Sequence, residues 1–405
     1  MIHTARIISI YAADTSGVCS ALYELNGLTA VHDASGCNST YSTHDEPRWF
    51  DYGSRIYISA LTEMDAVMGN DEKFIGDVIK AAKETEPDFI AVCGSPMPMM
   101  TGTDFDAIGE RIESESGIPV LTPHTNGMHS YLCGESQAID MLARRFCKTD
   151  IEKTEKISAN IIGATPLDFS LNGSFSSMCR CLNEAGIDIV STFTMKDNTT
   201  CGGLLESVKK AGSAWVNLVV SYGGLKTAEY LKSQFGTPYL CGVPAGKKYS
   251  AYLIEKLIDM ANGGNADNVN ETRSGNECGH KKRTAVVGES VYAASLAEAI
   301  NMDKDLYNLF GRAGVLCPLE TERGILPGDA VMIPDEDDFI KAVSDFDAVI
   351  ADRLYKPVCP AQVKFYELDH EAFSGRCFAK SIPDLIGRNF KTEDKGSGNI
   401  YIVAD

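Results

Sequence analysis

Two of the thirteen cysteines occupy positions that suit iron ligation. Cys37 follows the turn sequence His32–Gly36, and Cys93 ends the apolar segment Phe89–Cys93. A thiolate among free backbone N–H groups is stabilised, and such groups can also donate hydrogen bonds to the sulfides of an iron-sulfur cluster. The competing interpretation is that both cysteines are small core residues, because free cysteine is among the most buried residue types.

The elements expected around these cysteines form one α/β lobe. Short β-branched segments alternate with amphipathic stretches, which is typical of parallel sheets with crossover helices. In the first third we expect strands at 6–11, 27–33, 55–59, 88–93 and 119–122, and helices at 71–84, 104–116 and 133–147. Cys37 and Cys93 then share the rim at the carboxyl ends of the strands, where α/β proteins place ligands.

The same rhythm continues and predicts an α/β fold of three Rossmann-like lobes, each a mainly parallel sheet flanked by helices. The lobes are expected at 1–150, which carries the two cysteines, at 151–265 and at 283–405. A charged link at 148–156 separates the first two, and the Gly- and Asn-rich stretch 263–282 reads as an exposed linker before the third. Further strands are expected at 160–164, 187–193, 215–221, 237–241, 284–288, 314–317, 347–351 and 364–368, and helices at 173–185, 203–211, 225–235, 250–262, 292–302 and 335–343.

Charge and composition exclude several classes of function. The 37 basic and 56 acidic residues give a formal charge of -19, which repels nucleic acid and anionic membranes. No apolar run is long enough for a membrane span, and the first fifteen residues lack the features of a signal peptide, so we expect a cytoplasmic protein. The scattered, odd-numbered cysteines indicate thiols or metal ligands and not a disulfide framework.

Nucleotide-binding signatures are missing from the sequence. The string Gly242-Val-Pro-Ala-Gly-Lys247 is one residue too short for a phosphate-binding loop, and no hydroxyl for magnesium follows it. No G-x-G-x-x-G follows an expected strand, and zinc-peptidase, serine-hydrolase and paired C-x-x-C motifs are also absent. The sequence therefore offers no ATPase or dinucleotide site of its own.

Several motifs together resemble the nitrogenase component 1 family. In the first lobe they are His32-x-x-x-Gly36-Cys37, the stretch Glu63-Met-Asp65 to Lys73, and Cys93 followed by Gly102-Thr-Asp104. In the second lobe they are Asn160-Ile-Ile-Gly163, Leu182-Asn-Glu-Ala-Gly186, Asn217-Leu-Val-Val-Ser-Tyr222 and Tyr230 to Pro238. The third lobe matches more weakly, around 367–375. The resemblance covers nearly the whole chain and is strongest in the first 240 residues.

The resemblance implies an iron-sulfur cluster held between two subunits. Cys37, preceded by Gly36, and Cys93 match the second and third cysteine ligands of the family, whereas Ser9 stands where the first would be. Two subunits that each supply Cys37 and Cys93 would provide the four thiolates of one 4Fe-4S cluster. Two alternatives are open for each of two further residues. Ser9 is either an alkoxide ligand of the cluster or a core residue with a buried hydroxyl. Cys19 is either a displaced thiolate ligand or an ordinary cysteine on the face of a helix.

Two further departures from the family bear on the substrate. In one subunit of the family, a cysteine and a histidine far along the chain bind the large metal cofactor. Here Ser221 stands at the position of that cysteine, and Asp369, next to His370, stands at the position of that histidine. Hydroxyl and carboxylate are poor ligands for a sulfide-rich cluster, so we expect an organic substrate or small cofactor in place of dinitrogen. Tyr222, Asp369 and His370 could supply its protons, or they could be ordinary packed and solvated residues.

The resulting hypothesis is a nitrogenase-like oxidoreductase subunit of an anaerobic cytoplasm. The resemblance implies two partners: a second component 1-like subunit, either an identical chain or a close paralogue, and an ATP-hydrolysing nitrogenase-reductase-like iron-sulfur protein that supplies single electrons. A scaffold for metal-cofactor assembly would share these motifs. An α/β ligand-binding protein without a redox centre is the alternative from another class.

Overall fold

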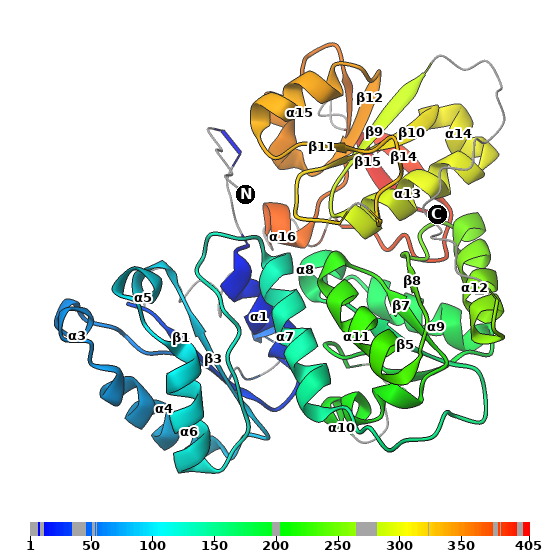
Figure 1. Cartoon of the computed structure of the whole chain (residues 1–405). Helices are drawn as coiled ribbons and strands as arrows, with labels where there is room; N and C mark the ends of the chain where they lie inside the picture. Colours follow the sequence, from blue (N-terminus) through cyan, green and yellow to red (C-terminus); the bar gives the residue numbers. More distant parts are fainter. Residues whose placement is uncertain are drawn as a thin grey trace.

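The computed structural model describes residues 7–8, 12–34, 46–50, 53, 55–196, 203–264, 282–322, 324–375, 380, 382–394 and 400–405. Within these ranges the chain forms three β-sheets of four, four and seven strands, and helices flank each sheet (Figure 1). In this view the first and second lobes lie beside each other, and the third lies above them. The predicted α/β class with a mainly parallel sheet in each lobe is confirmed.

The first lobe is built on a parallel sheet with the strand order β2-β1-β3-β4. Its strands are β1 (Leu28–His32), β2 (Ile56–Ile58), β3 (Ile90–Gly94) and β4 (Val120–Leu121). All five residues of β1 and of β3 are buried, as expected for central strands with a continuous apolar sequence and helices on both faces. These are the strands that position the candidate cysteines.

Among the residues that the structure describes, seven helical segments belong to the first lobe or border it. They are α1 (Asp14–Leu22), η1 (Pro47–Phe50), α3 (Glu63–Met68), α4 (Asp71–Thr85), α5 (Pro96–Thr101), α6 (Phe105–Ser116) and α7 (Tyr131–Phe146). Helix α4 buries Phe74, Ile75, Val78 and Ala82, a spacing that places them on one face against the sheet. No range was predicted for α1. All nine of its residues are buried, so its polar and apolar positions do not separate onto two faces of the helix.

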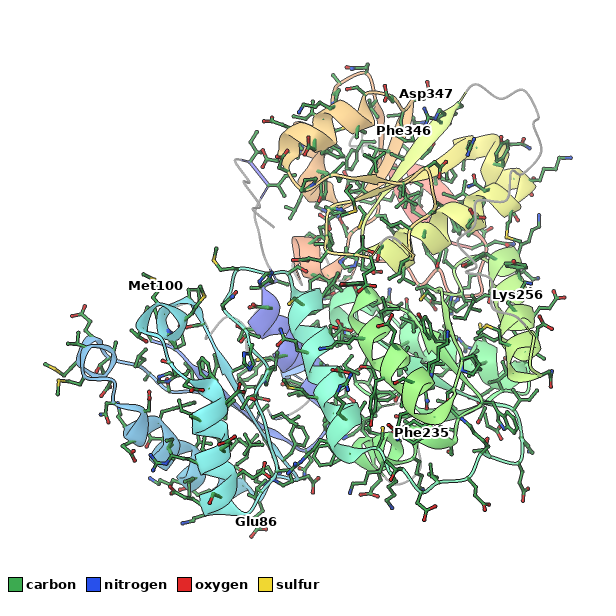
Figure 2. The ribbon with its side chains drawn as sticks, in the orientation of Figure 1. Glu86, Met100, Phe235, Lys256, Phe346 and Asp347 are labelled. Atoms are coloured by element: carbon green, nitrogen blue, oxygen red, sulfur yellow. The ribbon has the colours of Figure 1, made fainter. Side chains whose placement is uncertain are left out.

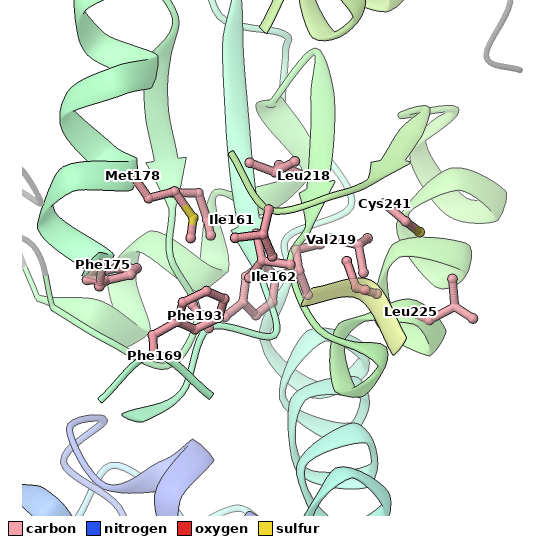
Figure 3. Close-up of a cluster of buried hydrophobic side chains, with 14 of the residues drawn as sticks. Ile161, Ile162, Phe169, Phe175, Met178, Phe193, Leu218, Val219, Leu225 and Cys241 are labelled. Carbon is pink, nitrogen blue, oxygen red and sulfur yellow. The ribbon is translucent and has the colours of Figure 1, made fainter. Parts of the chain in front are cut away.

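The second lobe has the strand order β6-β5-β7-β8, again parallel. Its elements are β5 (Ser158–Ile162), α8 (Pro166–Phe169), α9 (Ser174–Glu184), β6 (Asp188–Ser191), α10 (Leu204–Lys209), η2 (Ala211–Ser213), β7 (Val216–Val219), η3 (Tyr222–Gly224), α11 (Leu225–Phe235), β8 (Tyr239–Cys241) and α12 (Lys247–Ala261). Figure 3 shows its core, where Ile161, Leu218 and Val219 of the sheet pack among Phe169, Met178 and Leu225 from the surrounding helices.

The third lobe has the strand order β11-β10-β9-β12-β13-β15-β14, in which only β14 runs antiparallel to its neighbour. Its strands are β9 (Arg283–Val287), β10 (Arg312–Cys317), β11 (Val331–Met332), β12 (Ala348–Ala351), β13 (Lys364–Glu367), β14 (Phe390–Asp394) and β15 (Ile400–Ala404). Its helices are α13 (Ser290–Met302), α14 (Lys304–Phe310), α15 (Glu336–Val343), η4 (Arg353–Val358) and α16 (Glu371–Ser374).

The beginning of the chain departs from expectation in the residues that the structure describes. Residues 7 and 8 form a bend and not part of a strand at 6–11. The backbone N–H groups of Ile7 and Ile8 donate to Glu336 Oε1 of the third lobe, both at 2.7 Å. These two backbone groups therefore have a distant side chain as their hydrogen-bond acceptor, which sequence periodicity does not reveal.

Helices connect the three lobes. Helices α1 and α7 pack along each other between the first and second sheets, and α8 meets α16 below the third lobe (Figure 1). The Ser170 hydroxyl, which follows α8, donates a hydrogen bond of 2.7 Å to Glu371 Oε2 in α16. Across the described ranges, no helix combines the length and apolar character that crossing a membrane requires.

Candidate functional site

The first candidate region is the carboxyl edge of the first sheet. Strands β1 and β3 are parallel neighbours in which Val31 pairs with Cys93 and His32 with Gly94. Cys93 therefore lies near the end of β3, beside the point where β1 ends and the chain continues towards Cys37. The register thus places Cys93 at the carboxyl edge of the sheet, whereas the position of Cys37 at the same rim stays a prediction.

The Cys93 thiol is enclosed by the protein. Its side chain is fully buried, and burial raises the pKa of the thiol to about 12, with a further increase from the negative charge of Asp14. A hydrogen bond with Thr125 works in the opposite direction and favours the thiolate. Because a bare thiolate is disfavoured here, Cys93 would ligate a metal only where the charge of the metal compensates for desolvation.

Of the other residues predicted to hold the cluster, the structure describes only Cys19. Ser9, Gly36 and Cys37 lie outside the described residues. Cys19 is buried in α1 and packs in the same apolar core as Cys93. The described part of the chain contains no group of three or more His, Cys, Asp or Glu side chains that could hold a metal ion by themselves.

The described donors nevertheless match iron-sulfur chemistry in type. Cys93 has the soft sulfur atom that iron-sulfur clusters require, and it lies at the edge where β1 and β3 end side by side. A single chain with two such cysteines has too few thiolates for a cluster of four irons, so its ligand set fits a shared site. Ser9 and Cys19 stay predictions as additional ligands.

The second candidate region begins where β7 ends. Ser221 is completely buried, and its hydroxyl accepts a hydrogen bond of 3.4 Å from Gly223 N as the N-cap of η3. The neighbouring Tyr222 is half-buried, and burial raises the pKa of its phenol, with a further contribution from Glu322. Its backbone N–H donates to Glu289 Oε1 at 3.0 Å. Ser221 thus has a structural hydrogen bond of its own.

Asp369 is held in an ion pair. Its carboxylate receives two hydrogen bonds from the Arg353 guanidinium, of which the bond from Nε to Oδ1 is 2.6 Å long. The carboxylate is almost fully buried, whereas Arg353 is about one quarter exposed. Because both carboxylate oxygens accept from Arg353, this residue is better suited to holding the end of β13 in place than to donating a proton.

His370 has a different environment from its neighbour. Its backbone N–H donates to Asp352 Oδ2 at 2.8 Å, and its ring stacks edge-on against Phe373 at 4.8 Å between ring centroids. Its Nε2 atom lies 3.2 Å from Asp168 Oδ1 of the second lobe, although neither ring nitrogen has a hydrogen-bond partner among the described residues. The imidazole is therefore fixed in position with its hydrogen-bonding capacity available.

A small cavity lies between the second and third lobes, and both Asp369 and His370 line it. Asp168, Tyr292, Asp352, Tyr355 and Phe373 also contribute to its wall, together with apolar side chains of β9 and α13. Its volume of about 30 Å³ accommodates on the order of two water molecules. The described wall does not include Tyr222, so the structure brings together two of the three predicted proton donors.

Buried carboxyl groups from all three lobes meet beside this cavity. Glu135 of α7, Asp168 of α8 and Glu289 at the start of α13 influence one another electrostatically. Burial, and then the charge of Asp168, raises the pKa of Glu289 to about 7 even though three backbone N–H groups donate to its carboxylate. The same two causes raise the pKa of Glu135 well above its ordinary range.

Sequence reasoning missed Tyr131, Glu135, Asp168 and Glu289. Each lies at or beside a helix start, where an acidic or aromatic residue looks like an ordinary cap or surface residue. The pattern Ser130-Tyr-Leu-Cys-Gly134-Glu135 carried one signal that could have been used, because a Glu within an otherwise small and apolar helix face suggests burial.

Comparison with known proteins identifies a family. The family model described as nitrogenase component 1 type oxidoreductase matches residues 16–301 of this chain. The match covers the first two lobes and extends into α13 of the third, which agrees with the stronger resemblance of the first 240 residues.

Among curated relatives, similar sequences are light-independent protochlorophyllide reductase subunits B. The protein of Nostoc punctiforme (strain ATCC 29133 / PCC 73102) is 25% identical over 370 residues, which cover 80% of this chain and 71% of the relative. That of Mesostigma viride is 24% identical with the same two coverages, and that of Nostoc sp. (strain PCC 7120 / SAG 25.82 / UTEX 2576) is 26% identical over 63% of this chain and 54% of the relative. The aligned regions thus span between about half and 71% of these relatives.

Solved structures show the same architecture. The structure of nitrogenase Cp1 at pH 6.5 superposes with a TM-score of 0.63 and covers 94% of this chain and 93% of that one at 15% sequence identity. Nitrogenase Cp1 at pH 5 gives a TM-score of 0.61 at 17% identity. At such identities the likeness establishes the fold alone.

Proposed function

The chain belongs to the nitrogenase component 1 type oxidoreductase family, and from this premise we propose that it is a subunit of a nitrogenase-like reductase. It receives single electrons from a separate ATP-hydrolysing iron-sulfur protein and passes them to an organic or small-cofactor substrate, not to dinitrogen. The observation that carries the proposal is Cys93 at the carboxyl edge of the first sheet, beside the strand that leads to Cys37.

The proposed redox centre is a 4Fe-4S cluster held by Cys37 and Cys93 from each of two subunits. When bound, such a cluster accepts and releases one electron at a time. The residues of this chain supply its soft ligands, and the hydrogen bond with Thr125 lowers the cost of the Cys93 thiolate. The burial of Cys93 supports a site that excludes water.

An organic substrate is supported by the two positions that depart from the family pattern. The Ser221 hydroxyl caps η3, and the Asp369 carboxylate is bound to Arg353, so neither side chain is available as the anchor of a large metal cofactor. The similar proteins named protochlorophyllide reductase subunits also support an organic substrate. Of the predicted proton donors, His370 has the most suitable surroundings.

A methionine-rich surface supports association with a second component 1-like subunit. Helices α3 and α5 follow the carboxyl ends of β2 and β3, and their exposed side chains include Met64, Val67, Met68, Met97, Met99 and Met100. Val67 is 82% exposed and Met100 is 85% exposed. Figure 2 labels Met100, which belongs to α5. These flexible apolar side chains lie beside the edge of the sheet where the cluster is proposed. A protein partner bound there would cover both the methionine-rich surface and the cluster.

The electron donor and the cellular setting complete the proposal. Because the sequence lacks a phosphate-binding loop, ATP hydrolysis is assigned to the separate reductase. None of the nine described cysteines is in a disulfide, which supports a reducing compartment such as the cytoplasm. The anaerobic setting rests on the family resemblance.

Anaerobic purification with iron analysis tests the proposal. The wild-type protein should be brown and contain about four irons per dimer, the number in one shared cluster. Cys37→Ala and Cys93→Ala should each lose the visible absorption and most of the iron. Cys147→Ala, which removes another buried cysteine of the same apolar core, is the matched control that keeps both.

Three results would contradict this function. A colourless, iron-free wild type would favour ligand binding without a redox centre. Normal iron in both Cys37→Ala and Cys93→Ala would remove the ligand assignment. Molybdenum, vanadium or a much larger iron content in protein from its native source would contradict the organic substrate.

A further inference from the structure

Ser170 directly follows α8 and has a backbone conformation that residues with a side chain rarely adopt. Its φ is 53° and its ψ is -167°, a combination that is essentially confined to glycine because a Cβ atom crowds the backbone there. We propose that the turn beginning at Ser170 is a strained latch that holds α8 against the third lobe and thereby closes the inter-lobe cavity. That the opened cavity admits the substrate rests on the proposed function.

The cavity lies where an α/β sheet commonly binds its ligand. Its wall includes residues at the carboxyl ends of three parallel neighbours, namely Val287 of β9, Asp352 after β12 and Leu368 after β13. The chain passes from β9 to β10 on one side of β9 and returns to β12 on the other side, so the strand order reverses at this point. Crevices at such a reversal are the usual ligand sites of open parallel sheets.

Helix α8 is the part of the second lobe that closes this cavity. Among the wall residues that the structure describes, Asp168 of α8 alone comes from the second lobe, and all others belong to the third. The cavity of about 30 Å³ holds on the order of two water molecules, so an organic molecule does not fit. A ligand of that class can enter only if α8 and the third lobe move apart.

Two hydrogen bonds fasten the turn after α8 to the third lobe. The Ser170 hydroxyl donates to Glu371 Oε2 of α16 at 2.7 Å, and Asn172 Nδ2 donates to the carbonyl oxygen of Ile382 at 3.1 Å. Helix α16 lies beside α8 (Figure 1), and both Ile382 and Phe373 of α16 line the cavity. Both fastening points therefore border the cavity that they close.

Backbone strain and hydrogen bonding act in opposite directions at Ser170. The strained conformation costs free energy while the turn is fastened, and this cost disappears when φ returns to a negative value. The bond to Glu371 opposes the release, because Ser170 is buried and a buried hydroxyl that loses its partner is costly. Gly173 ends the turn with a φ of 95°, which costs a glycine little. The turn can therefore release its strain at a single residue.

Two substitutions at Ser170 separate the strain from the hydrogen bond. Ser170→Ala loses the hydroxyl but keeps the Cβ atom, so it retains the strain and should open most. Ser170→Gly also loses the hydroxyl, but it adopts this backbone conformation without strain and should open less than Ser170→Ala. If the turn were only a passive loop, the more flexible glycine variant would open more. The order of the two variants is therefore the decisive observation.

Opening is measured in two ways on the assembled protein, purified anaerobically. Hydrogen–deuterium exchange follows the backbone amides of Phe373 and Gly375, which are hydrogen-bonded within α16. Diethyl pyrocarbonate, used at constant pH, reports on the entry of a small molecule to His370 in the cavity wall, and exposed His124 outside the cavity is the internal reference. Ser170→Ala should raise both rates at least about tenfold, as expected for the loss of one buried hydrogen bond.

Ser207→Ala is the matched control, because it removes a buried hydroxyl of the same lobe from a residue in the ordinary helix α10. Both rates should stay at their wild-type values. Unchanged rates in folded Ser170→Ala, or faster rates in Ser170→Gly than in Ser170→Ala, would overturn the latch. If Ser170→Ala does not fold, Asn172→Asp must raise both rates or the proposal fails, since it keeps the acceptor for Ser174 N and loses the donor to Ile382.

Iron content, measured on the same samples, separates the latch from the proposed function. Iron-free wild type with the expected order of rates would contradict the redox function and support the latch. Normal iron content with the same rates in wild type and both Ser170 variants would do the reverse.

Discussion

Gly17 of α1 and Gly134 of α7 let two helix backbones touch. A Cβ atom on Gly17 would lie 1.9 Å from the carbonyl oxygen of Tyr131, and one on Gly134 would lie 1.8 Å from the carbonyl oxygen of Asp14. Each glycine therefore faces the backbone of the other helix. This crossing positions Tyr131, whose hydroxyl donates a hydrogen bond to Asp168. It also holds Asp14, which accepts hydrogen bonds from Asn126 N and Gly127 N, near Cys93.

Adding one methyl group at this crossing should be strongly destabilising. Gly134→Ala forces α1 and α7 apart, so we expect the free energy of unfolding to fall by about 3 kcal/mol, the upper range for an overpacked core. Chemical denaturation measures it. Gly76→Ala, on the exposed side of α4 with open space around its Cβ position, is the control and should stabilise the protein by up to about 1 kcal/mol. A loss of less than about 0.5 kcal/mol in Gly134→Ala would contradict the close crossing.

The buried carboxyl groups should make the protein less stable as pH rises. Glu289 and Glu135 have folded-state pKa values above those of an unfolded chain, so the folded state binds their protons more tightly. Their contribution to stability is fully present below about pH 4.5 and is lost as pH rises through the raised pKa of each group, which for Glu289 is about 7.

The variant Glu135→Gln should remove part of this pH dependence. The uncharged amide avoids the cost of ionising the site, so at pH 8 we expect roughly 1–2 kcal/mol more stability than in the wild type, and little difference at pH 5. Denaturant unfolding at both pH values measures the effect, with Glu255→Gln on the exposed face of α12 as control. A variant that is equally destabilised at both pH values would show that Glu135 acts through packing alone.

The methionine-rich surface of α3 and α5 should control assembly. Met68→Asp places a charge on the most exposed apolar face of the first lobe, and we expect the dimer dissociation constant to rise at least tenfold, since a charge at an apolar contact must be desolvated on binding. Light scattering over a concentration series measures the constant. Ile340→Asp replaces an exposed apolar residue of α15 in the third lobe and should leave assembly intact. Equal dimerisation of both variants would place the interface elsewhere.

Ser221 should contribute to stability and not to metal binding. Ser221→Ala removes the N-cap of η3, so we expect a loss of about 1 kcal/mol with unchanged iron content. Thr62→Ala, which removes the N-cap of α3, is the matched control with a similar loss. Iron loss in Ser221→Ala without iron loss in Thr62→Ala would show that Ser221 is a ligand after all.

Much of the fold was predictable because its signals are local. Strands β1 and β3 and helices α4 and α6 agree with the expected ranges, since a buried strand reads as a continuous apolar run and an amphipathic helix as a repeat near 3.6. Helix α1 and the antiparallel pair of β14 and β15 were missed. The first is buried on every side, and the second has a largely polar outer strand, so neither shows the expected period.

The sequence by itself determined the class of the fold, the family resemblance and the place of Cys93 at a strand end, all of which depend on the order of residues along the chain. Only the tertiary structure decided that Asp369 forms an ion pair with Arg353, whereas His370 lies beside Asp168, which accepts a hydrogen bond from Tyr131. The physical reason is that the proton affinity of a side chain depends on desolvation and neighbouring charge. Both are set by which remote elements pack together, and no local pattern records that packing.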